Sequence, residues 1–235
     1  MGERAGVTAL QQLVRPVALA QQHVLSVHDA LDPLLPWGGL RRGSVVRVGG
    51  RSFSAALSLS FALLARATAE GSWAGVVGVD DIGAVSAQEV GVALERLALV
   101  PRVPAEQWPV VTAALLDALD LVVVQPPARV RPSDARRLAT RARERGSLLL
   151  ALGDRWSEAV DLRMSVTGVQ WLGLGEGSGH LRARRIEVVA NGRGAASRER
   201  RAALWVPAPD GTPLARAAEA GSGMSRSRMR SRRVS

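Results

Sequence analysis

The sequence predicts a mixed α/β fold, a mostly parallel sheet with helices on both faces and a C-terminal antiparallel extension. Short, solidly apolar runs at 44–48, 120–124 and 147–152 are typical of strands buried on both faces. Predicted helices separate these strands along the chain, as in a doubly wound sheet. Two further predicted strands flank a Gly-rich turn at 173–179, which indicates an antiparallel hairpin after the parallel core.

The chain divides into three predicted parts. Residues 1–30 form an N-terminal helical segment, because apolar residues recur at roughly helical spacing from Val7 to Leu25. Pro16 should kink or split this helix. The helix either packs on its own domain or docks a partner, and the pattern leaves both open. Residues 31–206 form the core, and residues 207–235 form an Arg/Ser-rich tail that we expect to be disordered.

The elements of the core are predicted from apolar runs and from the residues that begin and end them. Ser86, with Glu89 three residues later, is the predicted N-cap of one helix, and Ser133 is that of another. Gly71 and Gly146 should end the helices that precede them. In order, the predicted elements are a strand at 44–48, a helix at 54–70, a strand at 73–79, helices at 86–97 and 105–118, a strand at 120–124, a helix at 133–145, and strands at 147–152, 162–172, 181–191 and 201–206.

Composition excludes several kinds of chemistry. The chain has 235 residues and is 47% apolar, enough for one domain with a large core. All 31 basic residues are Arg, so no lysine nucleophile or Schiff base can form. Without Cys there is no disulfide, thiol catalysis or Cys-ligated zinc, and the three His form no ligand pattern. We therefore expect no metal site.

The charge and the apolar runs indicate partners and location. The net charge of +10 favours an acidic partner such as nucleic acid, although a solvated Arg-rich surface explains it equally well. Arg15 and Pro16 break the N-terminal apolar stretch, so no secretory signal is evident. No apolar run reaches the roughly 18–20 residues of a membrane span. We expect a cytoplasmic protein without a membrane anchor.

The stretch at 31–57 has the layout of a phosphate-binding loop, a strand, a Gly-containing loop and a helix. A working loop reads G-x-x-x-x-G-K-[ST], in which backbone amides and the Lys bind phosphates and Ser or Thr holds magnesium. A motif that starts at Gly49 places Ser54, Ala55 and Ala56 at the last three positions. A motif that starts at Gly50 places Ala55, Ala56 and Leu57 there. Neither register supplies the cation, so we expect no nucleotide cofactor.

Arginines are the candidate contacts for nucleic acid or an acidic partner. The predicted helix at 133–145 carries Arg136, Arg137 and Arg141, which face DNA phosphates or solvent. Trp156, Trp171 and Trp205 could stack on bases, but packing explains them better. The tail adds candidate contacts at Arg226, Arg228, Arg230, Arg232 and Arg233.

Three segments together resemble the RecA recombinase family, over about 31–194. The segment LDPLLPWGGLRRGSVVRVGG resembles the entry to its P-loop, DLVVVQ its Walker B strand, and RRIEVVANGRG a late basic strand. The resemblance implies a RecA-like core. Gln125 stands where the Walker B Asp would hold magnesium through water, and Ala190 and Gly192 stand where two Lys would reach ATP. Asp80 or Asp81 falls near the family's catalytic Glu.

The segments that correspond to the two DNA-binding loops of the family are short here. About seven residues (126–132) follow the Walker B strand, and about ten (153–162) precede the hairpin. The departures therefore remove ATP binding, hydrolysis and strand exchange together, while the buried strands remain. We expect no enzyme activity.

A RecA-like scaffold without ATP chemistry resembles the ImuA family, in particular its ImuA-prime proteins. This resemblance implies an accessory role in SOS mutagenesis and error-prone translesion synthesis. The implied partners are an ImuB-type inactive Y-family polymerase homologue, an error-prone C-family polymerase indirectly, and DNA. The resemblance also implies association with the nucleoid on DNA damage. Two alternatives stay open, a stand-alone DNA-binding regulator of recombination and a cell-division inhibitor of the SulA type.

Overall fold

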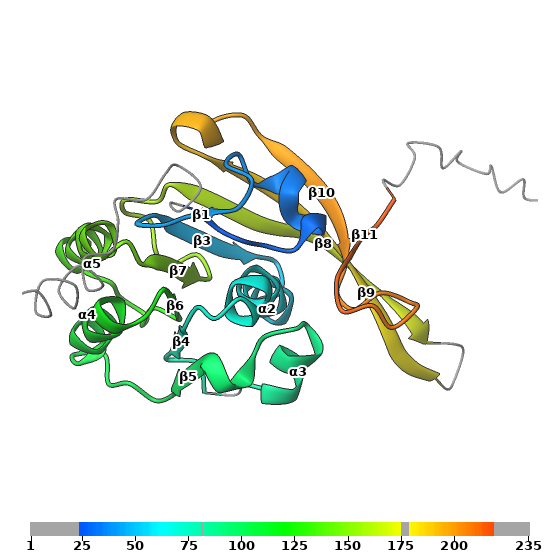
Figure 1. Ribbon diagram of the computed structural model, residues 1–235, viewed down its shortest axis with the longest axis horizontal. Coiled ribbons are helices and arrows are strands. Elements are labelled where there is room, and N and C mark those ends of the chain that lie inside the picture. Colours follow the sequence, from blue (N-terminus) through cyan, green and yellow to red (C-terminus); the bar gives the residue numbers. More distant parts are fainter. Residues whose placement is uncertain (1–23, 81, 175–178, 219–235) are drawn as a thin grey trace, which may run out of the picture.

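A single sheet organises the molecule, for which the computed structural model describes residues 24–80, 82–174 and 179–218 (Figure 1). The sheet has nine strands in the order β11-β10-β9-β8-β3-β7-β6-β4-β5. The strands from β8 to β5 run parallel to one another, and β9, β10 and β11 add antiparallel pairs at the other side. The predicted fold class, mostly parallel with an antiparallel extension, is confirmed.

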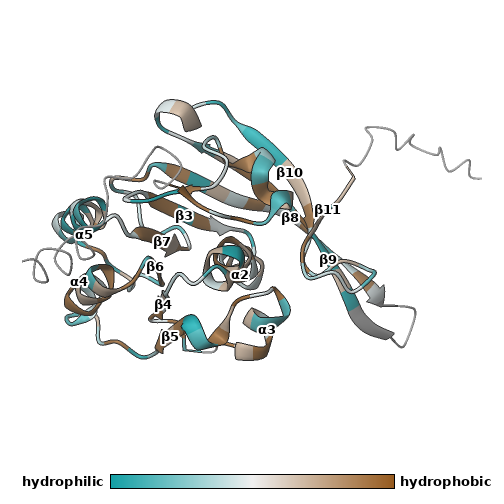
Figure 2. Cartoon of the chain, in the orientation of Figure 1, coloured by the Kyte–Doolittle hydropathy of each residue, from teal (hydrophilic) through white to brown (hydrophobic). Residues whose placement is uncertain are grey.

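The centre of the sheet consists of four short parallel strands, and nearly all of their residues are buried. Helices cover both of their faces, which explains why the sequence reads as continuous Val and Leu rather than as alternation. Figure 2 shows much of these strands in the brown of hydrophobic residues. They are β3 (Val45–Gly50), β4 (Ala74–Val77), β6 (Leu121–Val124) and β7 (Leu148–Leu152).

One face of the sheet is covered by α2 (Phe53–Ala69) and by the short helix α3 (Ala84–Glu89). The 3-10 helix η2 (Asp29–Leu34) joins the same hydrophobic core and contacts β10 and β9. α2 is buried along most of its length, so its apolar residues on all sides have partners. Gly71 has a φ of 101° just after α2, as predicted for the residue that ends this helix.

The opposite face is covered by α4 (Trp108–Ala118) and α5 (Pro132–Arg145). Trp108 and Trp156 meet edge to face here, with ring centroids 6.0 Å apart. α5 begins one residue earlier than predicted, because Pro132 occupies its first turn and Arg131 is the N-cap. Ser133 is therefore not the cap. Gly146 ends α5 in the left-handed conformation, as predicted.

A long antiparallel hairpin extends the sheet beyond the helices and is prominent in Figure 1. It consists of β8 (Leu162–Leu174) and β9 (Gly179–Gly192), with a register shift between Val166 and Gly168. β10 (Arg200–Trp205) pairs with β9. The hairpin and the following strand are confirmed close to their predicted positions.

The predicted helix at 86–97 is wrong over its second half. α3 ends at Glu89, because Gly91 takes a φ of 98° and the Val92 amide donates to Ala87. Its N-cap is Gly83 rather than Ser86. A 3-10 turn (Leu94–Arg96) then leads into the edge strand β5 (Leu97–Val100), which the sequence prediction missed.

The predicted start of the tail at residue 207 is also wrong. Leu214 is 2% exposed in the main core, and Ala208 is buried. β11 (Ala215–Arg216) pairs with β10, so the folded domain continues to the last described residues before 219. The remainder of the predicted tail lies outside the described residues.

The N-terminal prediction is tested only at its end. Residues 1–23 of the predicted helix lie outside the described residues. β1 (Val24–Leu25) pairs antiparallel with β2 (Leu40–Arg41), so the predicted helix does not extend through Leu25. Across the described residues, no helix combines the length and the apolar character that crossing a membrane requires.

Candidate functional site

The glycines of the predicted phosphate loop belong to strand β3. Gly49 and Gly50 pair with Ser165 and Val166 of β8, and the Arg51 amide donates to the Val166 carbonyl at 3.1 Å. Gly50 has a φ of 121°, and a Cβ there would lie 2.2 Å from that carbonyl oxygen. Only glycine fits this approach of two strands. The pairing with β8 thus explains Gly50 without reference to a phosphate.

The connection from β3 to α2 is a tight turn. Only Arg51 and Ser52 separate the two elements. Ser52 is the N-cap, and its Oγ accepts from the Ala55 amide at 3.3 Å. A phosphate-binding loop needs free amides at this point. Here the Ala55 amide already has a partner from its own chain.

The positions of the motif's Lys and Ser or Thr lie inside the protein. Ala55 and Ala56 are 0% and 1% exposed and belong to the hydrophobic core. Their methyl groups replace the charge and the hydroxyl that would contact ATP and magnesium. Ser54, at the position of the second Gly, is exposed. The local geometry therefore fits a packed strand-to-helix turn.

Gln125, at the Walker B position, follows β6 and donates its backbone N–H to Val77 at 2.9 Å. Strand β7 lies between β6 and β3, which carries the Gly49–Gly50 pair. Asp80 follows β4, and its carboxylate accepts the Arg102 amide at 3.2 Å. Asp81 lies outside the described residues, and within those described no group of three His, Asp or Glu could hold a metal ion.

The late strand β9 has no room for the lysines of the RecA family. Ala190 pairs with Met164 and is buried in the core. A Cβ at Gly192 would lie 2.0 Å from the carbonyl oxygen of Asp161. A long side chain at Gly192 would require the backbone to move.

The short loops predicted from the sequence are confirmed. Residues 125–131 connect β6 to α5, and residues 153–161 connect β7 to β8. Trp156, in the second loop, is fully buried, and its Nε1 donates to Glu158 at 2.7 Å. Trp156 is therefore a packing residue and not a surface for stacking bases.

The basic face of α5 is largely paired with carboxylates. Arg141 forms a two-point contact with Asp117 of α4, and Arg145 donates to the same carboxylate at 3.0 Å. Hydrogen bonding from Arg141 lowers the pKa of Asp117, and the same bond raises the pKa of Arg141. Arg137 contacts Asp134 at 3.4 Å. Of the predicted α5 contacts, Arg136 has only a backbone partner among the described residues, the Pro132 carbonyl.

The other aromatic and basic candidates are dispersed. Trp171, on the projecting hairpin, is 45% exposed, and the Arg184 guanidinium lies 5.0 Å from its ring centroid. Burial lowers the pKa of Arg184. Trp205 is half-buried in β10. The candidate arginines of the tail, from Arg226 to Arg233, lie outside the described residues.

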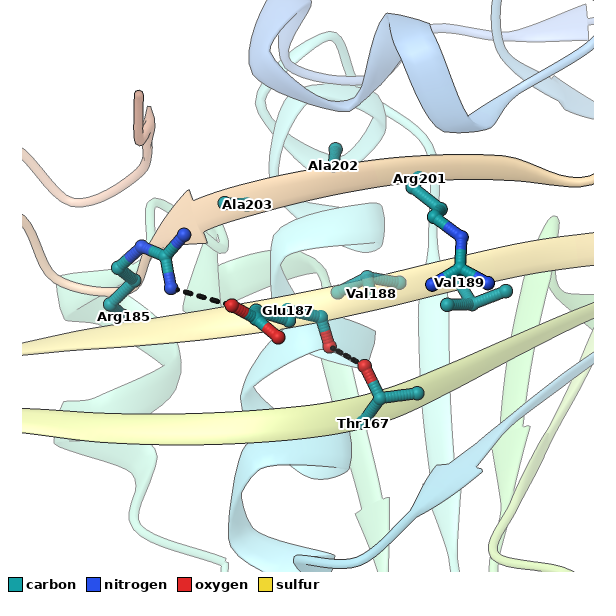
Figure 3. Close-up of a pocket in the computed structure, with 8 residues that line it drawn as sticks. All are labelled: Thr167, Arg185, Glu187, Val188, Val189, Arg201, Ala202 and Ala203. Atoms are coloured by element: carbon teal, nitrogen blue, oxygen red, sulfur yellow. Dashed lines mark hydrogen bonds and ion pairs between the residues drawn. The ribbon is translucent and has the colours of Figure 1, made fainter. Parts of the chain in front are cut away.

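Figure 3 shows a shallow cavity on the antiparallel part, lined only by residues of β8, β9 and β10. Its polar side chains already have partners, and that of Arg201 is Glu199, outside the cavity lining. Arg185 contacts Glu187 at 2.8 Å, and the Thr167 hydroxyl donates to the Glu187 carbonyl at 3.4 Å. The cavity is therefore a solvated sheet face without converging free donors.

A second cavity brings together residues that the sequence analysis did not select. Arg102 follows β5 and Arg155 follows β7, and both line a space beside Gln125 and Asp80. The one sequence signal that could have identified Arg102 and Arg155 as site residues is their position just after two strands. The carboxyl ends of parallel strands lie at one edge of the sheet, where ligands bind. With β5 missed, the position of Arg102 carried no such signal.

The fold and the turn define a class of α/β proteins. They keep the strand and the helix that flank a P-loop, but a packed turn replaces the phosphate-binding loop itself. Residues 33–158, which contain the parallel centre, match the family described as MT3502 N-terminal domain. The chain is also 34% identical over 203 residues to the uncharacterized protein Rv3395c of Mycobacterium tuberculosis, covering 80% of this chain and 93% of that relative. The chain belongs to the MT3502 family.

Proposed function

We propose that this protein is a non-catalytic, RecA-like accessory factor in error-prone translesion synthesis and damage-induced mutagenesis. Like the ImuA family that it resembles, it binds an ImuB-type inactive polymerase homologue and through it serves an error-prone C-family polymerase. In this proposal it acts in the cytoplasm, joins the nucleoid on DNA damage, and hydrolyses no ATP.

The observation that carries the proposal is the turn from β3 to α2. Ala55 and Ala56 are core residues, and the Ala55 amide is capped by Ser52. Binding ATP here would require a buried cation and a rebuilt loop. A protein with this scaffold and no nucleotide is best suited to binding other macromolecules.

Two other positions support the same interpretation. Ala190 packs in the core, and the closeness of Asp161 keeps Gly192 without a side chain. In the RecA family, Lys side chains at these two positions reach ATP across a filament contact, so both positions would have to accept Lys. Sterics at Gly192 oppose that change independently of the turn.

The DNA-binding alternative rested on α5 and on the tail. On α5, Arg137 and Arg141 are engaged by carboxylates of Asp134 and Asp117. These pairs would have to break, or share their arginines, before a phosphate could bind. No observation in the described part of the chain favours the cell-division alternative either, so we propose neither.

The experiment is co-purification with an ImuB-type protein encoded in the same genome. We expect a stable complex with the full chain. A variant that ends at Ala218 retains β11 and tests the tail, whereas a cut at 206 would remove Leu214 from the core. Failure of the full chain to form a complex, or saturable magnesium-dependent ATP binding, would overturn the proposal.

A further inference from the structure

A cavity of about 180 Å³ lies at the carboxyl edge of the parallel strands β4, β5 and β6. In open α/β sheets, this edge is where ligands bind. Residues from separate segments line it, among them Gly78, Asp80, Arg102, Trp108, Gln125 and Arg155. It is separate from the packed turn at Ala55, which follows β3 in another part of the sheet.

Two exposed arginines line this cavity without a carboxylate partner. Within the described residues, neither Arg102 nor Arg155 takes part in an ion pair. Arg155 makes one long contact, from Nη1 to the Pro126 carbonyl at 3.5 Å. Asp80 accepts the backbone amide of Arg102. The fork of donors on each guanidinium therefore remains largely open to a ligand.

The backbone at Arg102 is held in a strained conformation. Its φ is 46°, in the left-handed region that non-glycine residues rarely adopt. The bond from its amide to Asp80 holds this conformation at 3.2 Å. The chain thus maintains an unfavourable backbone geometry at a residue in the cavity wall.

Trp108 adds a buried donor without a partner. The residue is 2% exposed, and its Nε1 has no hydrogen-bond partner in the described structure. Buried indole N–H groups are normally paired, as that of Trp156 is with Glu158. An acceptor entering the cavity wall would satisfy this group. Gly78 lies beside this indole in the cavity wall, since a Cβ there would lie 3.9 Å from Trp108 Cδ1.

We propose that this cavity binds a phosphate group, with Arg102 and Arg155 as its charged donors and Trp108 as a third donor. The volume is below the roughly 300–1,000 Å³ of pockets for larger ligands, so it suits a single anionic group. The three donors come from three separate segments. A carboxylate offers them two acceptor oxygens, whereas a phosphate offers more. The Asp80 carboxylate can accept a hydrogen bond from the hydroxyl of a singly protonated phosphate.

The test is calorimetric titration of the full chain with inorganic phosphate, at constant ionic strength in chloride. We expect saturable binding, which Arg155→Gln and Arg102→Gln each weaken roughly tenfold or more, since each removes a charged hydrogen-bond donor from the phosphate. Trp108→Phe should weaken it less. Arg136→Gln, an exposed arginine of α5 outside the cavity, is the matched control and should bind as the wild type does.

Two further titrations distinguish the sources of the phosphate group. The ligands are a 5′-phosphorylated dinucleotide and the same dinucleotide with a 5′-hydroxyl. If the phosphorylated form binds more tightly than both the hydroxyl form and inorganic phosphate, the ligand is the 5′ end of a nucleic acid. Equal affinity for the dinucleotide and phosphate identifies a free phosphate site. No binding of either by the wild type, or equal binding by Arg155→Gln and wild type, overturns the inference. Arg155 is exposed, so this comparison does not depend on the core.

Discussion

Gly50 shows how a residue that suggests a phosphate loop can have a different cause. Its φ of 121° and the nearby Val166 carbonyl exclude any side chain. Gly71 also has a positive φ, of 101°, but a Cβ there meets nothing within 4 Å. A comparison of Gly50 with Gly71 therefore separates the energetic cost of the backbone conformation from that of a steric clash.

We predict that Gly50→Ala lowers the free energy of unfolding well beyond Gly71→Ala. The second substitution should cost about 1–2 kcal/mol, the price of a left-handed conformation for an L residue. The first adds displacement of β8 from β3. Urea unfolding of both variants measures the difference, and equal losses would refute the steric account.

Restoring the motif tests whether the turn can still hold a nucleotide. In the triple variant Ser54→Gly, Ala55→Lys and Ala56→Ser, the Lys would enter the core, where an unpaired charge is costly. We predict a less stable protein that binds no magnesium-ATP in a fluorescent-nucleotide titration. Ser54→Gly alone, at an exposed position, is the control for stability. Nucleotide binding by the triple variant would show that the loop is intact.

Single residues also mark the limits of the sequence analysis. Ser133 fits a cap by composition, but Pro132 already starts α5 because its fixed φ suits a first turn. Arg102 and Arg155 carry no motif, and their meeting depends on strand order rather than on spacing. By contrast, Gly71 and Gly146 were predictable, since left-handed helix ends favour glycine.

At the scale of elements, one carboxylate joins α4 to α5. Asp117 binds both Arg141 and Arg145, and these bonds lower its pKa from the ordinary 3.8. A carboxyl with a lowered pKa in the folded state stabilises the fold above its unfolded pKa. That contribution is lost as the pH falls below 3.8 through the folded value.

We therefore predict that Asp117→Asn is modestly less stable than the wild type at pH 7. The difference should shrink as the pH falls below about 4, where the wild-type carboxyl takes up a proton. Urea midpoints between pH 7 and pH 3 measure this trend. Glu106→Gln removes an exposed carboxyl just before the start of α4 and serves as the control. A difference that is constant with pH would contradict the assignment.

The second prediction at this scale concerns β11. Leu214 lies in the main core just before this strand, although its sequence context is rich in Pro and Gly. Leu214→Ala should cost about 2–5 kcal/mol in the free energy of unfolding, as for other large-to-small core changes. Arg216→Ala, exposed within β11, should change stability by less than about 0.5 kcal/mol. Equal effects would place residues 207–218 outside the folded domain.

At the scale of the whole molecule, the parallel centre was predictable and its edges were not. Strands such as β6 and β7 are apolar throughout because helices cover both faces. β5 is an edge strand that is only partly buried, and its sequence continues a helix-like pattern. β11 has two residues, too few for any periodicity to show. Both misses occur where few neighbours constrain the sequence.

The central claim is that this scaffold binds a polymerase-like partner without using ATP. The most direct measurement is the Kd of the full chain for an ImuB-type protein, with and without magnesium-ATP. The account predicts a measurable complex with the same Kd in both conditions, because the buried Ala55 and Ala56 supply neither the charge nor the hydroxyl that would hold the nucleotide. The absence of a complex, or a Kd that changes with ATP, would contradict it.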